Sequence, residues 1–232
     1  MSSWHRLIDY LTTASHWTGQ AGILHRLEQH MALTGVSVAI AAAVALPLGL
    51  ALGHVGRGGT LAINITNIGR AVPTFAVLTL LTLSPVGIGN RSTVIALVLF
   101  ALPPLVTNSY IGLREVDPEV RDAARGMGMS GWQLFRRVEL PLGMPLVMAG
   151  IRIATVQVWA TATIAALVGA GGLGRLITDG LSSHDQGQLL AGAVIVAALA
   201  LVVELLLALV QRQVDPLRRL RVAAATRGAD VT

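Results

Sequence analysis

Long apolar runs dominate this chain and restrict it to a helical fold that crosses a membrane. Of its 232 residues, 53% are hydrophobic and only 12% are charged. A helix needs about 20 consecutive apolar residues to span the hydrocarbon core of a bilayer. We therefore expect an all-α polytopic membrane protein with about five transmembrane helices. The predicted spans cover residues 31–53, 61–83, 93–113, 146–168 and 189–210.

The remaining residues divide the chain into three parts. Residues 1–30 mix tryptophan and tyrosine with polar residues at roughly helical spacing, which is typical of a helix at a membrane interface. The alternative is a poorly ordered tail. Residues 31–210 form the transmembrane domain, which includes a polar loop at 114–145, and residues 211–232 form an arginine-rich tail. Within the third span, Pro103 and Pro104 predict a kink or a break.

The charged residues exclude several classes of function. All 17 basic residues are arginine, so the chain lacks the lysine of a Walker A loop and cannot form a complete P-loop. Cysteine is absent, which excludes disulfides and thiolate metal sites. The arginines form no patch with interleaved aromatic residues, so we expect no nucleic-acid partner. The lipid bilayer is the expected environment.

The arginines also orient the chain, because cytoplasmic loops of membrane proteins carry an excess of them. With the 114–145 loop in the cytoplasm, five spans place the N-terminus outside and the C-terminus inside. The four arginines of the outer segments would be Arg6, Arg26, Arg91 and Arg175. The inner segments would hold Arg57, Arg114, Arg121, Arg125, Arg136, Arg137, Arg212, Arg218, Arg219, Arg221 and Arg227.

The polar loop predicts two short helices joined at a glycine corner. Pro118 suits the first turn of a helix, where its missing N–H costs nothing. Gly126 and Gly128 allow the chain to leave that helix through a left-handed residue. Ser130 can cap a second helix, and Pro141 predicts the next break.

The same loop contains a spaced motif. Asp122-Ala123-Ala124 is followed after three residues by Gly128, and after nine more by Val138-Glu139-Leu140-Pro141. This resembles the "EAA" loop of binding-protein-dependent ABC importer permeases, with Asp122 in place of the usual Glu and Val138 in place of Ile.

The resemblance implies a fold, partners and a set of coupling residues. The fold is that of type I, methionine-importer-like permeases in the bacterial inner membrane. The partners are two ABC ATPase subunits, a second permease subunit that is identical or homologous, and an external substrate-binding protein. ATP and magnesium would be bound by the ATPase, so this chain needs no cofactor and is not itself an enzyme. The residues that the resemblance assigns to ATPase coupling are Asp122, Ala123, Ala124, Gly128, Leu140 and Pro141.

Further stretches are similar to the branch of that family that imports osmoprotectants such as glycine betaine, choline and carnitine. They are His30–Leu33, Leu46–Gly49, Arg70–Pro73, Gly150–Arg152 and Ala165–Gly174. The branch implies uptake of a quaternary-ammonium solute. Two alternatives remain open: a methionine-type or other small-solute ABC importer, and an ATPase-independent secondary transporter or membrane scaffold.

A glycine-rich stretch after the fourth span fits the dinucleotide pattern G-x-G-x-x-G. That fingerprint requires a preceding strand, whereas this one follows an apolar helix, so we reject nucleotide binding. We expect instead an outer loop at a helix end, where glycine permits close backbone approach. The glycines of this loop are Gly169, Gly171, Gly172 and Gly174.

Several polar residues fall inside the predicted spans. Arg70, Arg152 and Glu204 are ionisable, and lone charges there are costly. We predict that Glu204 pairs with Arg152 or Arg70; the alternative is that each extends separately to the headgroups. Gln157 and Trp159 are candidates to line the transport path, with helix packing as the alternative. The scattered histidines suggest loop or interface positions and no metal site.

Overall fold

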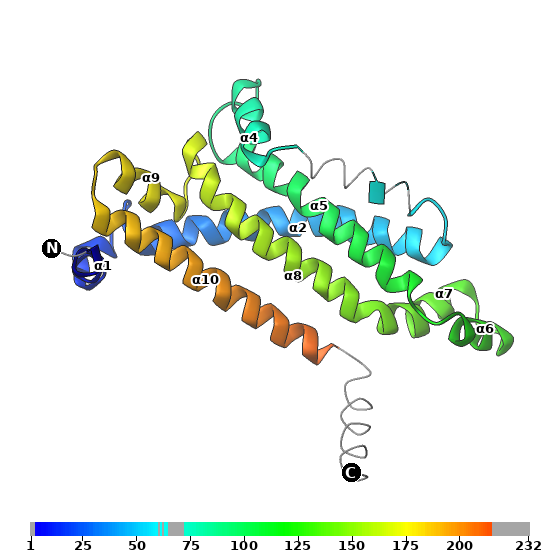
Figure 1. Ribbon diagram of the computed structural model, residues 1–232. Helices are drawn as coiled ribbons and strands as arrows, with labels where there is room; N and C mark the ends of the chain where they lie inside the picture. Colours follow the sequence, from blue (N-terminus) through cyan, green and yellow to red (C-terminus); the bar gives the residue numbers. More distant parts are fainter. Residues whose placement is uncertain (1–2, 60, 62, 65–71, 215–232) are drawn as a thin grey trace, which may run out of the picture.

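Four long helices form the body of the protein. The computed structural model describes residues 3–59, 61, 63–64 and 72–214. Helices α2 (Ile23–Val55), α5 (Asn90–Arg114), α8 (Leu140–Ala165) and α10 (Gln186–Gln213) run alongside one another (Figure 1). Each is long and apolar enough to cross a membrane, with the α8 span counted from Gly131 to Val168. The all-α polytopic prediction is confirmed.

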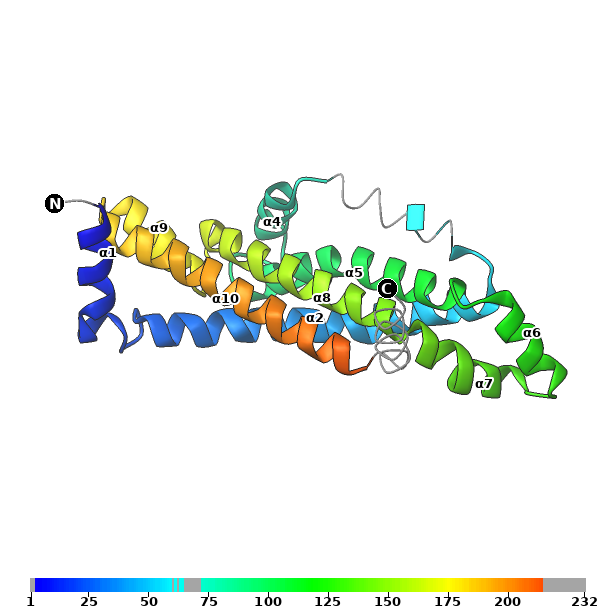
Figure 2. The same ribbon diagram turned by 60° about the horizontal axis from the view of Figure 1, so that its bottom comes forward.

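Most of the shorter helices lie at the two ends of this bundle, whereas α4 lies along its side (Figures 1 and 2). α1 and α9 lie at one end, and α6 and α7 lie at the opposite end (Figures 1 and 2). The shorter elements are α1 (Ser3–Thr12), η1 (Ala14–His16), α4 (Thr74–Leu83), α6 (Pro118–Gly126), α7 (Gly131–Leu134), the π-helical turn η2 (Phe135–Glu139), η3 (Ala166–Val168) and α9 (Gly174–Ser182).

The second predicted span, 61–83, is described only in part. Its second half forms α4, whose 10 residues are too few to cross a bilayer alone. Residues 60, 62 and 65–71 lie outside the described part of the chain. A fifth span through this region therefore stays a prediction.

The first span begins earlier than predicted. α2 starts at Ile23 instead of residue 31, and Gly22, whose backbone is extended, precedes it as the N-cap. Its first turns carry His25, Glu28 and Gln29, which interrupt the apolar pattern without interrupting the helix. Hydropathy alone therefore placed the start of α2 too late.

Of the kink or break predicted at Pro103 and Pro104, the break does not occur. α5 continues through both prolines from Asn90 to Arg114. Pro104 has no N–H to donate to the Phe100 carbonyl, and the amide of Gln157 in α8 donates to that oxygen at 3.4 Å. The Asn108 amide also donates to the Pro104 carbonyl at 2.8 Å. The neighbouring helix thus supplies a partner for a group that the proline leaves unpaired, which lets a proline stay inside a membrane helix.

The main core lies where α2, α5 and α8 meet. Its buried members are mostly small or branched side chains, and glycines allow the backbones to approach closely. A Cβ built on Gly112 of α5 would lie 2.8 Å from the Gly143 carbonyl oxygen of α8. The buried members are Leu33, Ala41, Ala45, Leu97, Ala101, Leu105, Val106, Ala154, Val158 and Ala162.

α10 is covered on one side only. It packs on α8, α9 and α1, whereas large side chains on its other face, such as Leu201, Leu205 and Leu209, are exposed. An apolar face of this size suits contact with lipid or another membrane subunit.

α1 is an ordered helix that crosses the end of the bundle (Figure 2). Leu7 and Tyr10 are buried against a second core cluster that includes Ile23, Trp159 and Ala191. The Arg6 guanidinium donates to Gln186 of α10 at 3.0 Å. The expected N-terminal helix is therefore present, and the alternative of a disordered tail is wrong for residues 3–12. Its place at a membrane interface remains a prediction.

Candidate functional site

The segment that carries the spaced motif forms two short helices with a glycine corner, as the sequence predicts. The Asp117 carboxylate caps α6 by accepting the Glu119 N–H at 2.9 Å. Ser130 and Gln133 form a reciprocal capping box at the start of α7. Gly128 has φ +81°, whereas Gly126 ends α6 without a positive φ. Only Gly128 therefore requires glycine for its backbone conformation.

The Asp122-Ala123-Ala124 segment is held by its backbone at this corner. The carbonyls of Ala123 and Ala124 accept the N–H groups of Met127 and Met129 at 3.0 and 3.2 Å. Ala124 is buried, whereas Ala123 and Asp122 are exposed. Asp122 lies 3.5 Å from Arg125 in an exposed pair, so its carboxylate is accessible to a partner protein.

The predicted break at Pro141 is absent, because the helix widens ahead of it. Residues 135–139 form the π-helical turn η2, and the Leu140 N–H donates to the carbonyl of Phe135, five residues earlier. A wider turn leaves room for the proline ring, which would otherwise clash with a carbonyl of the preceding turn. Leu140 and Pro141 are thus the first residues of α8.

The α6–α7 segment (residues 118–134) presents large apolar side chains to its surroundings. Met127 is 73% exposed and Trp132 is 66% exposed. Trp132 stacks on Phe135 with ring centroids 5.5 Å apart. A hollow of about 290 Å³ beside it is lined by Trp132, Gln133, Arg136 and Arg137. Exposed Trp, Met and Arg side chains are enriched at protein–protein interfaces.

A buried carboxylate that the sequence did not single out lies in the second half of the motif and pairs with α6, the helix that carries the first half. Glu139 has a side chain only 1% exposed, and it contacts His54 and Arg121. His54 had been expected at a loop or interface position; it lies in the last turn of α2 and is paired with this carboxylate. The only local signal was the position of Glu139 inside Val138-Glu139-Leu140-Pro141, which says nothing about partners distant in sequence.

Arg152 and Glu204 form the predicted ion pair between α8 and α10. The Arg152 Nε lies 3.2 Å from a Glu204 oxygen. Gln211, which sequence reasoning missed, accepts from the Arg152 Nη1 at 2.8 Å and donates to the Pro145 carbonyl at 2.9 Å. The other proposed partner, Arg70, lies outside the described residues.

Gln157 and Trp159 both have packing roles in the structure. Gln157 donates to the Phe100 carbonyl, as described above. Trp159 is buried, its indole N–H donates to the Val196 carbonyl at 3.3 Å, and its ring meets His30 edge-on at 4.4 Å. These contacts favour the packing alternative, most clearly for Trp159.

The glycine loop lies at the end of the bundle opposite α6 and α7, where it packs on the start of α2. The Gly172 N–H donates to the Gln29 amide oxygen at 3.0 Å. Gly169 and Gly172 have positive φ, and a Cβ on Gly174 would lie 2.1 Å from the Thr163 carbonyl oxygen. The predicted close backbone approach is confirmed.

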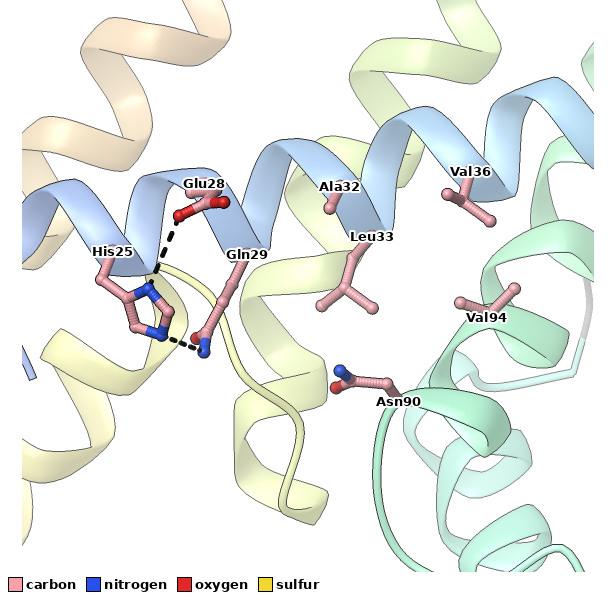
Figure 3. A pocket seen from close by; sticks show the side chains of 8 residues that line it. All are labelled: His25, Glu28, Gln29, Ala32, Leu33, Val36, Asn90 and Val94. Carbon is pink, nitrogen blue, oxygen red and sulfur yellow. Dashed lines mark hydrogen bonds and ion pairs between the residues drawn. The ribbon is translucent and has the colours of Figure 1, made fainter. Parts of the chain in front are cut away.

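Figure 3 shows how the α2 side of this contact is held in place. His25 lies between two residues of its own helix, 3.6 Å from a Glu28 oxygen and 2.9 Å from the Gln29 amide nitrogen. Both the oxygen and the nitrogen of the Gln29 amide are therefore engaged. Beside them an opening of about 310 Å³ has mostly apolar walls, formed by Ala32, Leu33, Val36 and Val94, and Asn90 points into it (Figure 3).

A family model described as "Binding-protein-dependent transport system inner membrane component" matches residues 43–219. This range includes α5, the α6–α7 segment, α8 and α10. The chain belongs to this family. Its members are membrane components of transport systems, in agreement with the membrane-length helices found here.

Relatives within the family are permeases of osmoprotectant transport systems. The chain is 33% identical to the glycine betaine/carnitine/choline transport system permease protein OpuCB of Bacillus subtilis, over 86% of this chain and 91% of that one. It is 34% identical to the carnitine transport permease protein OpuCD of Listeria monocytogenes, over 95% and 97%. It is 37% identical to the osmoprotectant import permease protein OsmY of Salmonella typhimurium, over 85% and 84%.

Solved structures confirm the type of fold. An inward-facing structure of the MetNI methionine ABC transporter matches with a TM-score of 0.72 and 23% identity, covering 82% of this chain and 95% of that one. An amino acid ABC transporter matches with a TM-score of 0.68 and 20% identity, covering 82% and 93%. The chain therefore has the methionine-importer-like permease fold that the resemblance implied.

Proposed function

We propose that this chain is the membrane permease of an ATP-driven importer for quaternary-ammonium osmoprotectants such as glycine betaine, choline or carnitine. The observation that carries the proposal is its similarity, along nearly the whole chain, to permeases of such systems. That similarity reaches 34% identity over 95% of this chain for the Listeria carnitine permease.

The α6–α7 segment supports a coupling role. It projects at one end of a bundle of membrane length (Figure 1). Its exposed Met127 and Trp132, with Arg136 and Arg137 of the following turn η2, offer an anchor to a soluble partner. The partner we propose is an ABC ATPase that binds ATP and magnesium. The sequence has no lysine and so no complete P-loop, which supports nucleotide binding by another subunit.

The proposed cycle requires no chemical step in this chain. Two permease subunits enclose the path, and an external binding protein delivers the solute. ATP binding closes the ATPase dimer and displaces α6 and α7, and this movement opens the path outward. Hydrolysis then resets the path. The residues proposed to couple the two subunits are Asp122, Ala123, Ala124, Gly128, Leu140 and Pro141.

We assign α6 and α7 to the cytoplasm, the N-terminus to the outside and the C-terminus to the cytoplasm. The excess of arginine in and around the α6–α7 segment supports this orientation. The glycine loop and α1, at the opposite end of the bundle, then face the outside (Figure 2).

A methionine-type importer is the second candidate, because the fold is similar to that of the MetNI transporter. The two candidates make opposite predictions for solute competition. If the chain serves an osmoprotectant importer, excess unlabelled glycine betaine should abolish uptake of labelled glycine betaine, whereas excess methionine should leave that uptake unchanged. A secondary transporter is the remaining class, and it would leave the spacing of the EAA-like motif without an explanation.

Co-purification with the ATPase tests the coupling proposal. We expect the wild-type permease to retain its ATPase on an affinity column and Trp132→Ala to lose most of it. Ile8→Ala, which removes an exposed apolar side chain of α1 at the other end, is the matched control and should behave as wild type. Equal retention by Trp132→Ala and wild type would contradict the docking role of this surface.

A further inference from the structure

Glu139 lies at a junction of four helical segments on the coupling side of the protein. Its own turn, η2, leads into α8. His54, in the last turn of α2, has its Nδ1 2.5 Å from one carboxylate oxygen, and Arg121 of α6 has its Nε 3.5 Å from the other. Arg121 also donates to the carbonyl of Leu113, in the last turn of α5. One buried carboxylate and its arginine thus link α2, α5 and α6 to the turn that leads into α8.

The two faces of α6 differ in a way that fits this arrangement. Glu119, Asp122 and Arg125 are exposed, whereas Arg121 is buried. The exposed face is available to a partner protein, and on the buried face Arg121 forms an ion pair with Glu139. Any displacement of α6 therefore acts directly on the carboxylate.

A second set of contacts leads to the same carboxylate from α7. Trp132 stacks on Phe135, and Phe135 meets the His54 ring edge-on with centroids 5.5 Å apart. His54 then donates to Glu139, which as a carboxylate can only accept. The exposed Trp132 and the buried Glu139 are therefore joined by contiguous packed side chains.

We propose that Glu139 is a positioning residue that makes α6, the start of α8 and the cytoplasmic end of α2 move as one unit. This inference rests on the proposed function, because it concerns how a push from the ATPase reaches the membrane helices. Without the carboxylate, α6 keeps its backbone connections through residues 115–117 and 127–130, but it loses its charged link to α2 and α8. Displacement of α6 would then be absorbed by these short connections.

The alternative is that Glu139 only stabilises the fold. Breaking a buried charge pair is destabilising in any protein, so loss of stability alone does not separate the two roles. The quantity that separates them is the amount of solute transported per ATP hydrolysed by assembled complex. A purely structural residue changes the amount of complex, whereas a transmitting residue changes this ratio.

The test uses the complete complex of permease, ATPase and binding protein in proteoliposomes, with labelled glycine betaine as the probe. ATP hydrolysis and uptake are measured on the same vesicles and normalised to assembled complex. For Glu139→Gln we expect hydrolysis to continue and transport per ATP to fall about tenfold, within the ~5–150-fold range of coupling between sites. Arg121→Gln should have a similar effect, and the double variant should be little worse than either single variant.

His54 supplies a conservative rescue. His54→Gln retains an N–H donor for Glu139 and should keep most of the coupling, whereas His54→Leu should lose it. Glu28→Gln, the same chemical change on an exposed glutamate at the other end of α2, is the matched control and should leave the ratio unchanged.

Each outcome decides the proposal. A normal ratio in both Glu139→Gln and His54→Leu overturns it, whether or not less complex assembles. If Glu139→Gln fails to assemble, His54→Leu alone decides: a reduced ratio supports the proposal and a normal ratio overturns it. Absence of ATP-dependent uptake by the wild-type complex would contradict the proposed function itself, and this inference with it.

Discussion

Arg152 of α8 and Glu204 of α10 form an ion pair between two membrane-length helices, with the Arg152 Nε 3.2 Å from a Glu204 oxygen. The two side chains are 30% and 38% exposed, so neither charged group is fully buried. Gln211 extends the pair to the Pro145 carbonyl near the start of α8. The pair therefore fixes α10 to α8 at a point where α10 otherwise presents a largely exposed apolar face.

Removing one member of this pair should destabilise the permease. We expect Glu204→Gln to lower the free energy of unfolding by less than the ~3–5 kcal/mol typical of fully buried pairs, because both side chains are partly exposed. Neutralising the partner as well, in Glu204→Gln with Arg152→Gln, should restore part of the loss. Thermal unfolding in detergent measures both effects. Strict additivity of the two single variants would show that the pair contributes no interaction energy.

The glycine corner between α6 and α7 should tolerate no β-branched residue. Gly128 has φ +81° with open space around its Cβ position, so the cost of Gly128→Val is backbone strain of about 1–3 kcal/mol. We predict normal membrane insertion but lost or uncoupled transport. Gly126→Val is the control, since Gly126 has equally open surroundings without a positive φ. Wild-type uptake by Gly128→Val would refute the requirement.

Asp122 should act through its charge on the ATPase. Because Asp122 is exposed, its carboxylate stabilises α6 only weakly, by about 0.3–1 kcal/mol through the helix dipole. We therefore expect Asp122→Asn to leave stability nearly unchanged while reducing ATPase activity that is stimulated by solute-loaded binding protein. Glu119→Gln, on the same helix but outside the motif, should reduce it less. If Asp122→Asn has normal stimulated ATPase activity, the carboxylate does nothing more than stabilise α6.

The orientation is testable with single cysteines, because the chain has none. Leu173 in the glycine loop is a poor position for a label, since its side chain is fully buried. Ser183, directly after α9, is exposed, and cysteine is close to serine in size. We predict that an impermeant thiol reagent labels Ser183→Cys in intact cells, whereas it labels Met127→Cys only after the inner face is opened. The reverse pattern would invert the topology.

Much of this architecture follows from local sequence patterns. Apolar runs of bilayer length predict the long helices, and the proline, glycine and serine positions predict the α6–α7 corner, because capping and turn chemistry are local. The Arg152–Glu204 pair was predictable for another reason: few charges occur inside the spans, so each has few possible partners.

Other features depend on contacts between residues that are distant in the sequence. His54 and Glu139 are 85 residues apart, and their pairing depends on how α2 packs against η2. The break expected at Pro103 and Pro104 does not occur, and the Phe100 carbonyl, which receives no N–H from Pro104, accepts instead from Gln157 in another helix. The break expected at Pro141 failed because a π-helical turn makes room for its ring.

The central claim is that this permease imports quaternary-ammonium solutes with energy from a separate ATPase, and uptake into proteoliposomes tests it most directly. The complex is reconstituted with its binding protein outside and ATP enclosed, and labelled glycine betaine and labelled methionine are supplied in parallel. The account predicts accumulation of glycine betaine that requires both ATP and the binding protein, with no accumulation of methionine. Accumulation of methionine in place of glycine betaine, or uptake of glycine betaine without ATP, would contradict it.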